Sequence, residues 1–490
     1  MRLAPFAPLA LAFAACGPTP HKPPVDPEPA TTATTVAVSD PPARKAEEIV
    51  TLEAAPASRF VKADQRGDLV VRFELGANPA KDQKRPPINI SLVVDTSGSM
   101  EGDAIKDARA ASLALVDALA EGDRLSVVSF NSDTELLVPS TLLDKDSIAT
   151  VKSRIEAMKA RGTTDLAGGL RAGLTEVQKG FQQSGVNRVV LLGDGVPNDP
   201  GPIPALAQEA AQRRIPVTVM GLGLDYNETL MNTIAQTSGG HYHFIKESSK
   251  VASVFTDEVL RLKRVVARNT VFRVTPGPGV TIKEVIGLPT SASGTSQVVM
   301  LGDLGENEHR NVLVRLDVSG HRAGATVELL DAELSFEDAT RGAARLSEKS
   351  FLGVRASADA AEITGGRNAE VEKAATRATL AARIVQAIAL ARSGQLPQAQ
   401  SLLDQSEKEA KAAVKTLGIT DLDEKLKGIP ALRKSLASMA PPPMPPMPAG
   451  GPGGMPRPAA PPAPYAPADK ASAAVVMDAQ AAAVRAIEDR

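Results

Sequence analysis

The sequence predicts an α/β fold whose main domain is a doubly wound, mainly parallel sheet covered by helices on both faces. Between residues 86 and 265, apolar runs of strand length alternate with segments of helical periodicity. The runs are INISLVV, RLSVVSF, RVVLLG, IPVTVMGLG and HYHFI. Continuous apolar runs are typical of strands that are buried on both faces, and strands that alternate with helices form parallel sheets.

The segments on either side of this region have a two-residue period, which is typical of half-buried antiparallel strands. Val71, Phe73 and Leu75 alternate with polar neighbours before the region. Further strand candidates follow it at 271–274, 297–300, 311–318 and 326–336. We therefore expect the α/β domain, residues 86–265, to be inserted in a β-sandwich formed by residues 51–85 and 266–360. A separate sandwich after the domain is the alternative.

The rest of the chain divides into helical and proline-rich segments. Residues 366–439 carry apolar residues at helical spacing and predict a helical hairpin or small bundle. Residues 16–50 and 440–467 are rich in proline and lack apolar periodicity, so we expect a disordered tether and a linker. Residues 468–490 predict a short helical tail, for which a frayed end is favoured over a docking segment.

The first residues predict export. Residues 1–15 combine Arg2, an apolar run and small residues before Cys16, which is the layout of a signal peptide. This stretch resembles a bacterial lipoprotein signal, in which the cysteine becomes the lipidated N-terminus; an ordinary cleaved signal with a leftover cysteine is the alternative. The resemblance implies a lipid anchor in the bacterial cell envelope. Gly17 is not the aspartate of inner-membrane retention signals, which favours the outer membrane.

Composition excludes several classes of function. The chain has 55 basic and 57 acidic residues, so it lacks the basic excess that nucleic-acid binding usually requires. Aromatic residues make up 3% of the chain and tryptophan is absent, which leaves little material for stacking bases or sugars. The single cysteine excludes an internal disulfide and a cysteine-based zinc site.

Oxygen-bearing side chains follow two of the predicted strands of the α/β domain, and another stands at the start of one of its predicted helices. Asp95, Ser97 and Ser99 come directly after the first strand, Thr164 stands at the start of a predicted helix, and Asp194 follows another strand. Ligands of doubly wound sheets bind beyond the carboxyl ends of the strands, where these residues lie. Hard divalent cations prefer such oxygen ligands, and Mg²⁺ keeps some positions for water or an external ligand. The spacing therefore predicts a metal site.

This pattern resembles the metal-ion-dependent adhesion site of von Willebrand factor type A (VWA) domains. The resemblance covers residues 86–265 and rests on Asp-x-Ser-x-Ser, the loop GTTDL and the strand that ends in Asp-Gly. It implies that Ser97, Ser99 and Thr164 are ligands of Mg²⁺, with Mn²⁺ or Ca²⁺ as alternatives. Asp95 and Asp194 would act directly or through water. An open coordination position would accept an Asp or Glu carboxylate of a partner protein.

One position departs from the family pattern, because Gly193 stands where a threonine is common. The order of domains also resembles bacterial surface and periplasmic VWA proteins and parts of the inter-α-trypsin inhibitor heavy chains. These resemblances predict an exported, membrane-anchored binding protein rather than an enzyme.

Three other interpretations compete with this one. The first is an envelope scaffold whose metal site is vestigial. The second is a haloacid dehalogenase-like phosphatase, but Ser97 replaces the acid that this chemistry needs two residues after the nucleophile, and Pro197 interrupts the metal loop. In the third, Ser97 and Ser99 only cap the following helix and Asp194 caps a turn.

Overall fold

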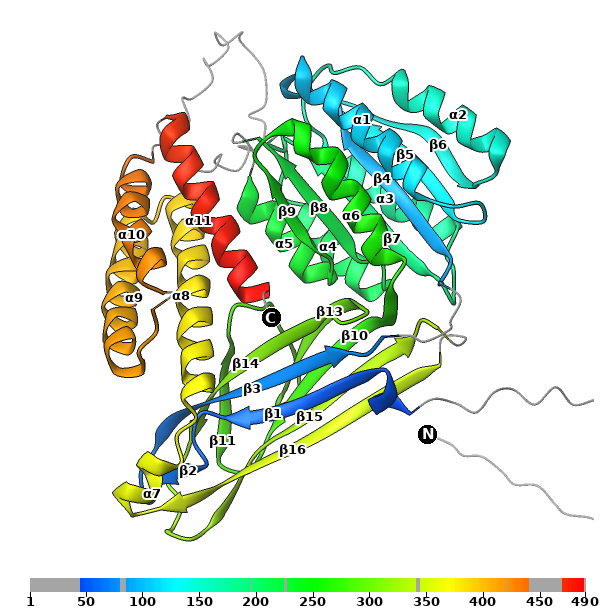
Figure 1. Cartoon of the computed structure of the whole chain (residues 1–490). Coiled ribbons are helices and arrows are strands. Elements are labelled where there is room, and N and C mark those ends of the chain that lie inside the picture. Colours follow the sequence, from blue (N-terminus) through cyan, green and yellow to red (C-terminus); the bar gives the residue numbers. More distant parts are fainter. Residues whose placement is uncertain are drawn as a thin grey trace, which may run out of the picture. The chain divides into compact units, whose positions relative to one another are not determined.

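The computed structural model describes residues 45–79, 85–194, 196–223, 227–340, 344–420, 422–439 and 469–488 (Figure 1). The predicted signal peptide, Cys16, most of the tether and the proline-rich linker lie outside these residues. Within them, no helix combines the length and the hydropathy that crossing a membrane requires.

The α/β domain is built on a six-stranded sheet. Its strands are β4 (Ile88–Asp95), β5 (Arg124–Phe130), β6 (Thr134–Leu142), β7 (Val186–Gly193), β8 (Val217–Leu222) and β9 (Tyr242–Ile245). They lie in the order β6-β5-β4-β7-β8-β9, and neighbours are parallel except β5 and β6. Every residue of β4 and β7 is buried, as the continuous apolar runs predicted. The predicted fold class is confirmed.

Helices cover both faces of this sheet (Figure 1). They are α1 (Asp103–Ala118), α2 (Lys145–Glu156), α3 (Leu166–Lys179), α4 (Ile203–Gln212), α5 (Glu228–Ser238) and α6 (Val251–Leu262). Successive side chains of a strand point to opposite faces. Ile90 and Leu92 of β4 accordingly pack in one apolar cluster with α1, α2 and α6, and Val93 packs in another with α3, α4 and α5.

Strands that precede and follow the α/β domain in the sequence form a β-sandwich of two sheets. Its strands are β1 (Val50–Pro56), β2 (Phe60–Lys62), β3 (Gly67–Ala77), β10 (Val265–Pro276), β11 (Val280–Val285), β12 (Ser291–Ser293), β13 (Ser296–Gly305), β14 (His309–Val318), β15 (Thr326–Asp338) and β16 (Arg345–Ser357). The sheets have the orders β1-β3-β14-β11 and β12-β13-β10-β15-β16-β2. Strand β3 precedes the α/β domain yet pairs with β14, where Val71 lies opposite Val314. Strands from both sides of the domain therefore complete the same two sheets.

The two sheets share one apolar core. Phe73 of β3 meets Phe272 of β10 edge to face, with ring centroids 5.0 Å apart and planes at 60°. Such aromatic pairs add about 0.5–1.5 kcal/mol beyond the area that they bury. The contact links a strand before the α/β domain to one after it.

The C-terminal region is helical. It consists of α7 (Ala360–Gly365), α8 (Ala369–Arg392), α9 (Leu396–Leu417), α10 (Leu422–Ala437) and α11 (Lys470–Glu488), and three short 3₁₀ helices occur earlier at η1 (Ala46–Glu48), η2 (Gly98–Met100) and η3 (Ser248–Lys250). The expectation of a frayed tail is wrong, because α11 buries Val476, Met477 and Val484. The helix has apolar residues on two adjacent faces that can pack against the rest of the protein. In an alanine-rich sequence this pattern is hard to recognise.

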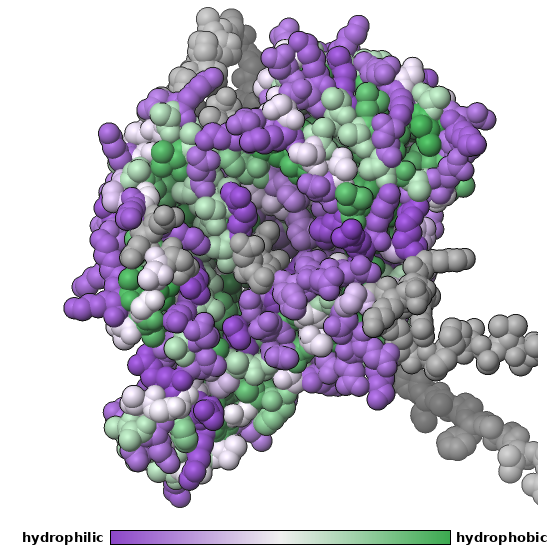
Figure 2. All heavy atoms as spheres, viewed as in Figure 1, coloured by the Kyte–Doolittle hydropathy of each residue, from purple (hydrophilic) through white to green (hydrophobic). Residues whose placement is uncertain are grey.

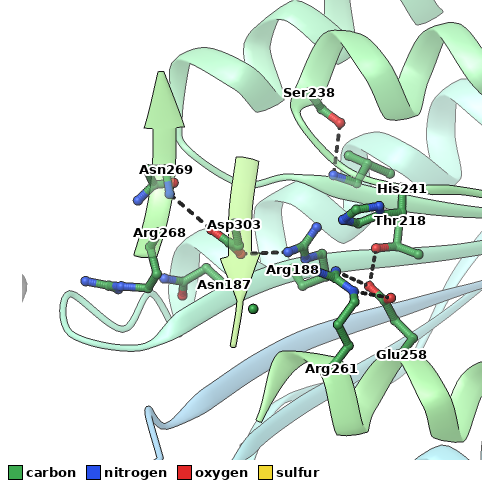
Figure 3. Close-up of polar contacts among 12 residues, drawn as sticks. Asn187, Arg188, Thr218, Ser238, His241, Glu258, Arg261, Arg268, Asn269 and Asp303 are labelled. Carbon is green, nitrogen blue, oxygen red and sulfur yellow. Dashed lines mark hydrogen bonds and ion pairs between the residues drawn. The ribbon is translucent and has the colours of Figure 1, made fainter. Parts of the chain in front are cut away.

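Charged side chains fill the joint between the α/β domain and the sandwich (Figure 3). Arg188 of β7 donates from Nη2 to Oδ2 of Asp303 in β13 at 2.6 Å, and both side chains are buried. Beside them, Glu258 of α6 accepts hydrogen bonds from Thr218 at 2.6 Å and from Arg261 at 2.9 Å. We call these five residues the joint cluster. Its charges are compensated inside the protein, which buried charges require.

The outer surface is mostly hydrophilic in the view of Figure 2. Among the described residues, the well-exposed large apolar side chains are Leu136, Leu142, Phe181, Val196, Leu260 and Phe351. Leu136 and Leu142 share β6 and the other four come from separate parts of the chain. Scattered exposed apolar residues of this kind are normal on protein surfaces. A partner surface is therefore better sought among the polar groups of the sheet edge.

Candidate metal-ion site

The loop after β4 gathers three of the predicted residues. Asp95, the last residue of β4, is 1% exposed and accepts a hydrogen bond from the backbone N–H of Ser97, with 2.7 Å between the heavy atoms. The Ser97 and Ser99 hydroxyl oxygens lie 3.0 Å apart. Ser97 is buried, whereas Ser99 is exposed. The loop thus holds one carboxylate inside the protein and brings one hydroxyl to the surface.

Asp194 reaches the same point from the neighbouring strand. Strands β4 and β7 are parallel neighbours, with Val94 opposite Leu192, so their carboxyl ends meet at one edge of the sheet. The Ser99 hydroxyl donates to Oδ1 of Asp194 at 2.8 Å. The structure therefore joins two loops that are about a hundred residues apart in the sequence, as the edge rule predicted.

Thr164 lies in a third loop that backbone hydrogen bonds tie to the other two. Gly98 N–H donates to the Gly162 carbonyl at 3.0 Å, and Asn198 N–H donates to the Thr164 carbonyl at 3.0 Å. Thr164 itself is 7% exposed. Gly162 has a φ of +72°, and a Cβ there would lie 2.5 Å from the Ser132 hydroxyl, so this turn requires glycine.

Polar residues that sequence reasoning missed support these loops. The Asn131 side chain donates to the Thr96 hydroxyl at 3.1 Å, next to Asp95. Asn198 donates from its side chain to the Thr163 hydroxyl at 2.9 Å, next to Thr164. Asn131 directly follows β5, at the same carboxyl edge of the sheet as Asp95. The rule that predicted the other residues would have found it.

The capping interpretation does not describe the serines. Ser97 is the residue before η2, but its side chain makes no capping hydrogen bond to that helix. The residue before α1 is Gly102, which has no side chain to offer. Real caps occur close by, because Asp165 accepts from Gly168 N–H at the start of α3 at 2.9 Å. The Ser97 and Ser99 hydroxyls instead face each other, and the Ser99 hydroxyl donates to Asp194.

The donor set fits a hard divalent cation. Neighbouring ligands of an octahedral Mg²⁺ at 2.0–2.1 Å lie about 3 Å apart. The Ser97–Ser99 and Ser99–Asp194 oxygen separations are 3.0 and 2.8 Å, close to that spacing. Two carboxylates would offset the charge of the ion. In the described part of the chain, this site included, no three His, Cys, Asp or Glu side chains group in a way that could hold a metal, so hydroxyl oxygens must complete the donor set here.

Gly193, the residue before Asp194, influences the site only through the room that it leaves beside Asp95. Gly193 brings backbone alongside Asp95, and a Cβ at this position would lie 3.4 Å from Oδ2 of Asp95. That distance is an ordinary contact, so a small side chain would fit here. The glycine removes none of the five predicted oxygen-bearing groups.

Comparison with known proteins identifies a family that the α/β domain resembles and several similar chains. Residues 89–257 match the model of the von Willebrand factor type A domain. The uncharacterized protein YfbK of Escherichia coli (strain K12) is 27% identical over 265 residues, which cover 52% of this chain and 46% of that protein. The uncharacterized protein sll0103 of Synechocystis is 27% identical over 289 residues, covering 56% of this chain and 68% of that one. The inter-alpha-trypsin inhibitor heavy chain H4 of Bos taurus is 27% identical over 184 residues, covering 35% of this chain and 20% of that one.

The match extends beyond the α/β domain at the level of fold. A solved structure, a von Willebrand factor type A protein from Catenulispora acidiphila, aligns with a TM-score of 0.65 and 17% identity. The alignment covers 89% of this chain and 97% of the other. The combination of an α/β domain, sandwich and helical region is therefore a shared architecture.

Proposed function

We propose that the von Willebrand factor type A domain formed by residues 89–257 binds a partner protein through a divalent cation at the carboxyl edge of its sheet. Domains of this family typically mediate protein–protein interaction. The observation that best supports the cation is the chain of oxygens from Ser97 through Ser99 to Asp194, whose spacing suits neighbouring ligands of one ion.

Each residue has a role in this proposal. Ser97, Ser99 and Thr164 contribute hydroxyl oxygens, and Asp95 and Asp194 act directly or through water. Mg²⁺ is the first candidate, and Mn²⁺ and Ca²⁺ are the alternatives. When bound, the ion supplies a coordination position for an Asp or Glu carboxylate of the partner. Asp95 also fixes the loop by accepting the Ser97 N–H, while the exposure of Ser99 gives a partner access.

We further propose that the protein is exported and lipid-anchored in the bacterial cell envelope through Cys16, with the outer membrane preferred. The signal-like residues before Cys16 support this proposal. The proline-rich tether after it is long enough to separate the folded part from the membrane.

Substituting Asp95 by Asn should abolish stabilisation by Mg²⁺. The amide keeps an acceptor for the Ser97 N–H but removes the buried negative charge that balances the ion. At a free concentration one hundred times Kd, binding stabilises the folded state by about 2.7 kcal/mol. Thermal unfolding of the full chain with Mg²⁺ and with EDTA should therefore show a metal-dependent shift in Tm for the native sequence and none for Asp95→Asn.

Asp103→Asn is the matched control, because Asp103 is an 86% exposed carboxylate at the nearby start of α1 and pairs with Lys106 on its own helix. This variant should retain the full shift. Partner capture from envelope extracts should likewise require Mg²⁺ and Asp95. Equal metal-dependent shifts in Tm for Asp95→Asn and Asp103→Asn would show that Asp95 does not contribute to metal binding. The absence of any shift in the native chain would favour the scaffold with a vestigial site, and hydrolysis of an aryl phosphate would favour the phosphatase.

Changing Cys16 to Ser should move the protein out of the membrane fraction or block its processing, because serine offers no thiol for lipidation. Fractionation of expressing cells, followed by detection of the full chain, measures this directly. A Cys16→Ser protein that is cleaved normally and stays with the membrane would contradict the lipid anchor.

A further inference from the structure

Helix α11 is wedged between the α/β domain and the helical region. It lies along the outer edge of β9 and beside α8 (Figure 1). Lys246, just after β9, pairs with Asp478 of α11 at 3.1 Å. At the other end, Gly287 of the sandwich approaches so closely that a Cβ there would lie 2.9 Å from the Ile487 side chain. One helix therefore contacts all three parts of the folded chain.

Two parallel stripes on α11 make these contacts. Val476, Gln480, Ala483 and Ile487 repeat with spacings of four, three and four residues, and the apolar members of this stripe pack in the cluster of the helical region. The second stripe is shifted by one residue, and its members Met477 and Val484 pack in a cluster of the α/β domain. Residues three and four apart share one face of a helix. Helix α11 thus has two apolar faces, one that packs on the helical region and one that packs on the α/β domain.

The first stripe contains one buried polar residue. Gln480 is fully buried, and neither its Oε1 nor its Nε2 has a hydrogen-bond partner within the described residues. A buried amide that lacks protein partners weakens the interface that buries it, because docking removes it from bulk water and no side chain or backbone group of the described residues takes over its hydrogen bonds. In helix pairs, one polar residue in an apolar seam sets the register at a cost in stability. Docking of α11 is therefore specific but weakened at its centre.

We propose that the groove formed by β9, α8 and α10 is a docking site for an amphipathic helix, and that α11 is its releasable occupant. Residues 440–468 connect α10 to α11, so a released helix stays tethered close to the groove. The α/β domain keeps a second link to the helical region while α11 is away. Glu228 of α5 accepts from Nε of Arg392 in α8 at 2.8 Å, and both side chains are largely buried.

Release has a structural consequence for the sheet. Strand β9 is the last strand in the order, and within the described residues it pairs with β8 alone. An uncovered sheet edge is a template on which another extended chain can pair. Strand β9 lies two strands from β7, which leads to Asp194, so a chain paired on the uncovered edge would extend the same sheet that carries the proposed metal site.

Hydrogen exchange of the full chain tests the release. Amides of α11 should exchange through a local opening that leaves α9 protected and depends only weakly on denaturant. Gln480→Met keeps the size of the side chain and removes the unpaired amide, so α11 protection should rise about tenfold. Asp478→Lys places like charges together and should lower α11 protection about two- to fivefold. The double variant Lys246→Asp with Asp478→Lys should restore it.

Protection of α9 is the internal control and should stay the same in every variant. The proposal is overturned if α11 exchanges only with global unfolding, in step with α9, because the helix would then be a fixed part of the fold. It is equally overturned if Gln480→Met leaves α11 protection unchanged or lowers it. If Gln480→Met folds poorly, Asp478→Lys and its double variant with Lys246→Asp test the release independently. None of these readouts requires a metal or a partner.

Discussion

Replacing Asp303 by Asn should lower the free energy of unfolding by about 3–5 kcal/mol, because it leaves a buried arginine without its counter-charge. The Arg188 side chain is 0% exposed and that of Asp303 is 3% exposed. Burial lowers the pKa of Arg188 and the Asp303 carboxylate opposes that change, so the ion pair is what keeps the guanidinium charged inside the protein. The carboxylate has a second duty, because its Oδ1 accepts from Asn269 N–H at 3.1 Å.

Asp68→Asn is the matched control for this substitution. It makes the same chemical change in another ion pair of the sandwich, between Asp68 of β3 and Lys283 of β11, whose side chains are 51% and 43% exposed. Exposed pairs contribute about 0–1 kcal/mol, so this variant should unfold close to the native protein. Urea unfolding of both variants gives the comparison. Equal losses would mean that water reaches Arg188 in solution and that the joint cluster does not hold the domain to the sandwich.

A double variant separates charge from packing. Arg188→Met with Asp303→Leu removes both charges and leaves apolar groups in the same space. Such replacements of buried ion pairs are often neutral or stabilising, so the double variant should recover most of the stability that Asp303→Asn loses. A double variant as unstable as Asp303→Asn would show that removing the uncompensated charge is not enough to restore stability, and that the double variant also needs the acceptor for Asn269 N–H that leucine lacks.

The sequence predicted the features of the α/β domain that repeat locally. The apolar runs located its central strands, and the edge rule placed Asp95, Ser97, Ser99 and Asp194 together. Strand β6 was missed because it lies at the edge of the sheet and leaves Leu136 exposed, which erases the apolar pattern. Thr164 was included from its place at the start of a predicted helix, and the resemblance to a known family implied its role as a ligand.

Features that depend on distant partners could not be predicted in this way. Arg188 stands at the beginning of a strand and reads as an ordinary charged flank, because its partner Asp303 comes 115 residues later. Gln480 likewise reads as the polar side of an exposed helix until the groove that buries it is known. Residue pattern predicts which elements form, whereas the contacts between domains depend on how those elements meet.

Gly302→Ala should be among the most destabilising single substitutions in the chain, with a loss above about 4 kcal/mol. A Cβ at Gly302 of β13 would lie 1.7 Å from the carbonyl oxygen of Gly239, the residue that ends α5. Backbone on both sides of this contact leaves no flexible group to move aside, so the α/β domain must shift away from the sandwich. Gly302 also has a φ of +74°, which a residue with a Cβ adopts only at a cost.

Gly294→Ala isolates the contribution of the contact. Gly294 has a similar φ of +64°, but nothing lies within 4 Å of a Cβ built there. Gly294→Ala should therefore lower the free energy of unfolding only by the cost of placing alanine at a positive φ, about 1 kcal/mol. The difference in unfolding free energy between the two variants measures the close approach of Gly302 to Gly239. Because that approach lies on the same strand as Asp303, Gly302→Ala should also loosen the joint cluster, and amides at the start of β7 should exchange faster than in the native chain. Equal losses for the two alanine variants would mean that the α/β domain does not rest on the sandwich at this point.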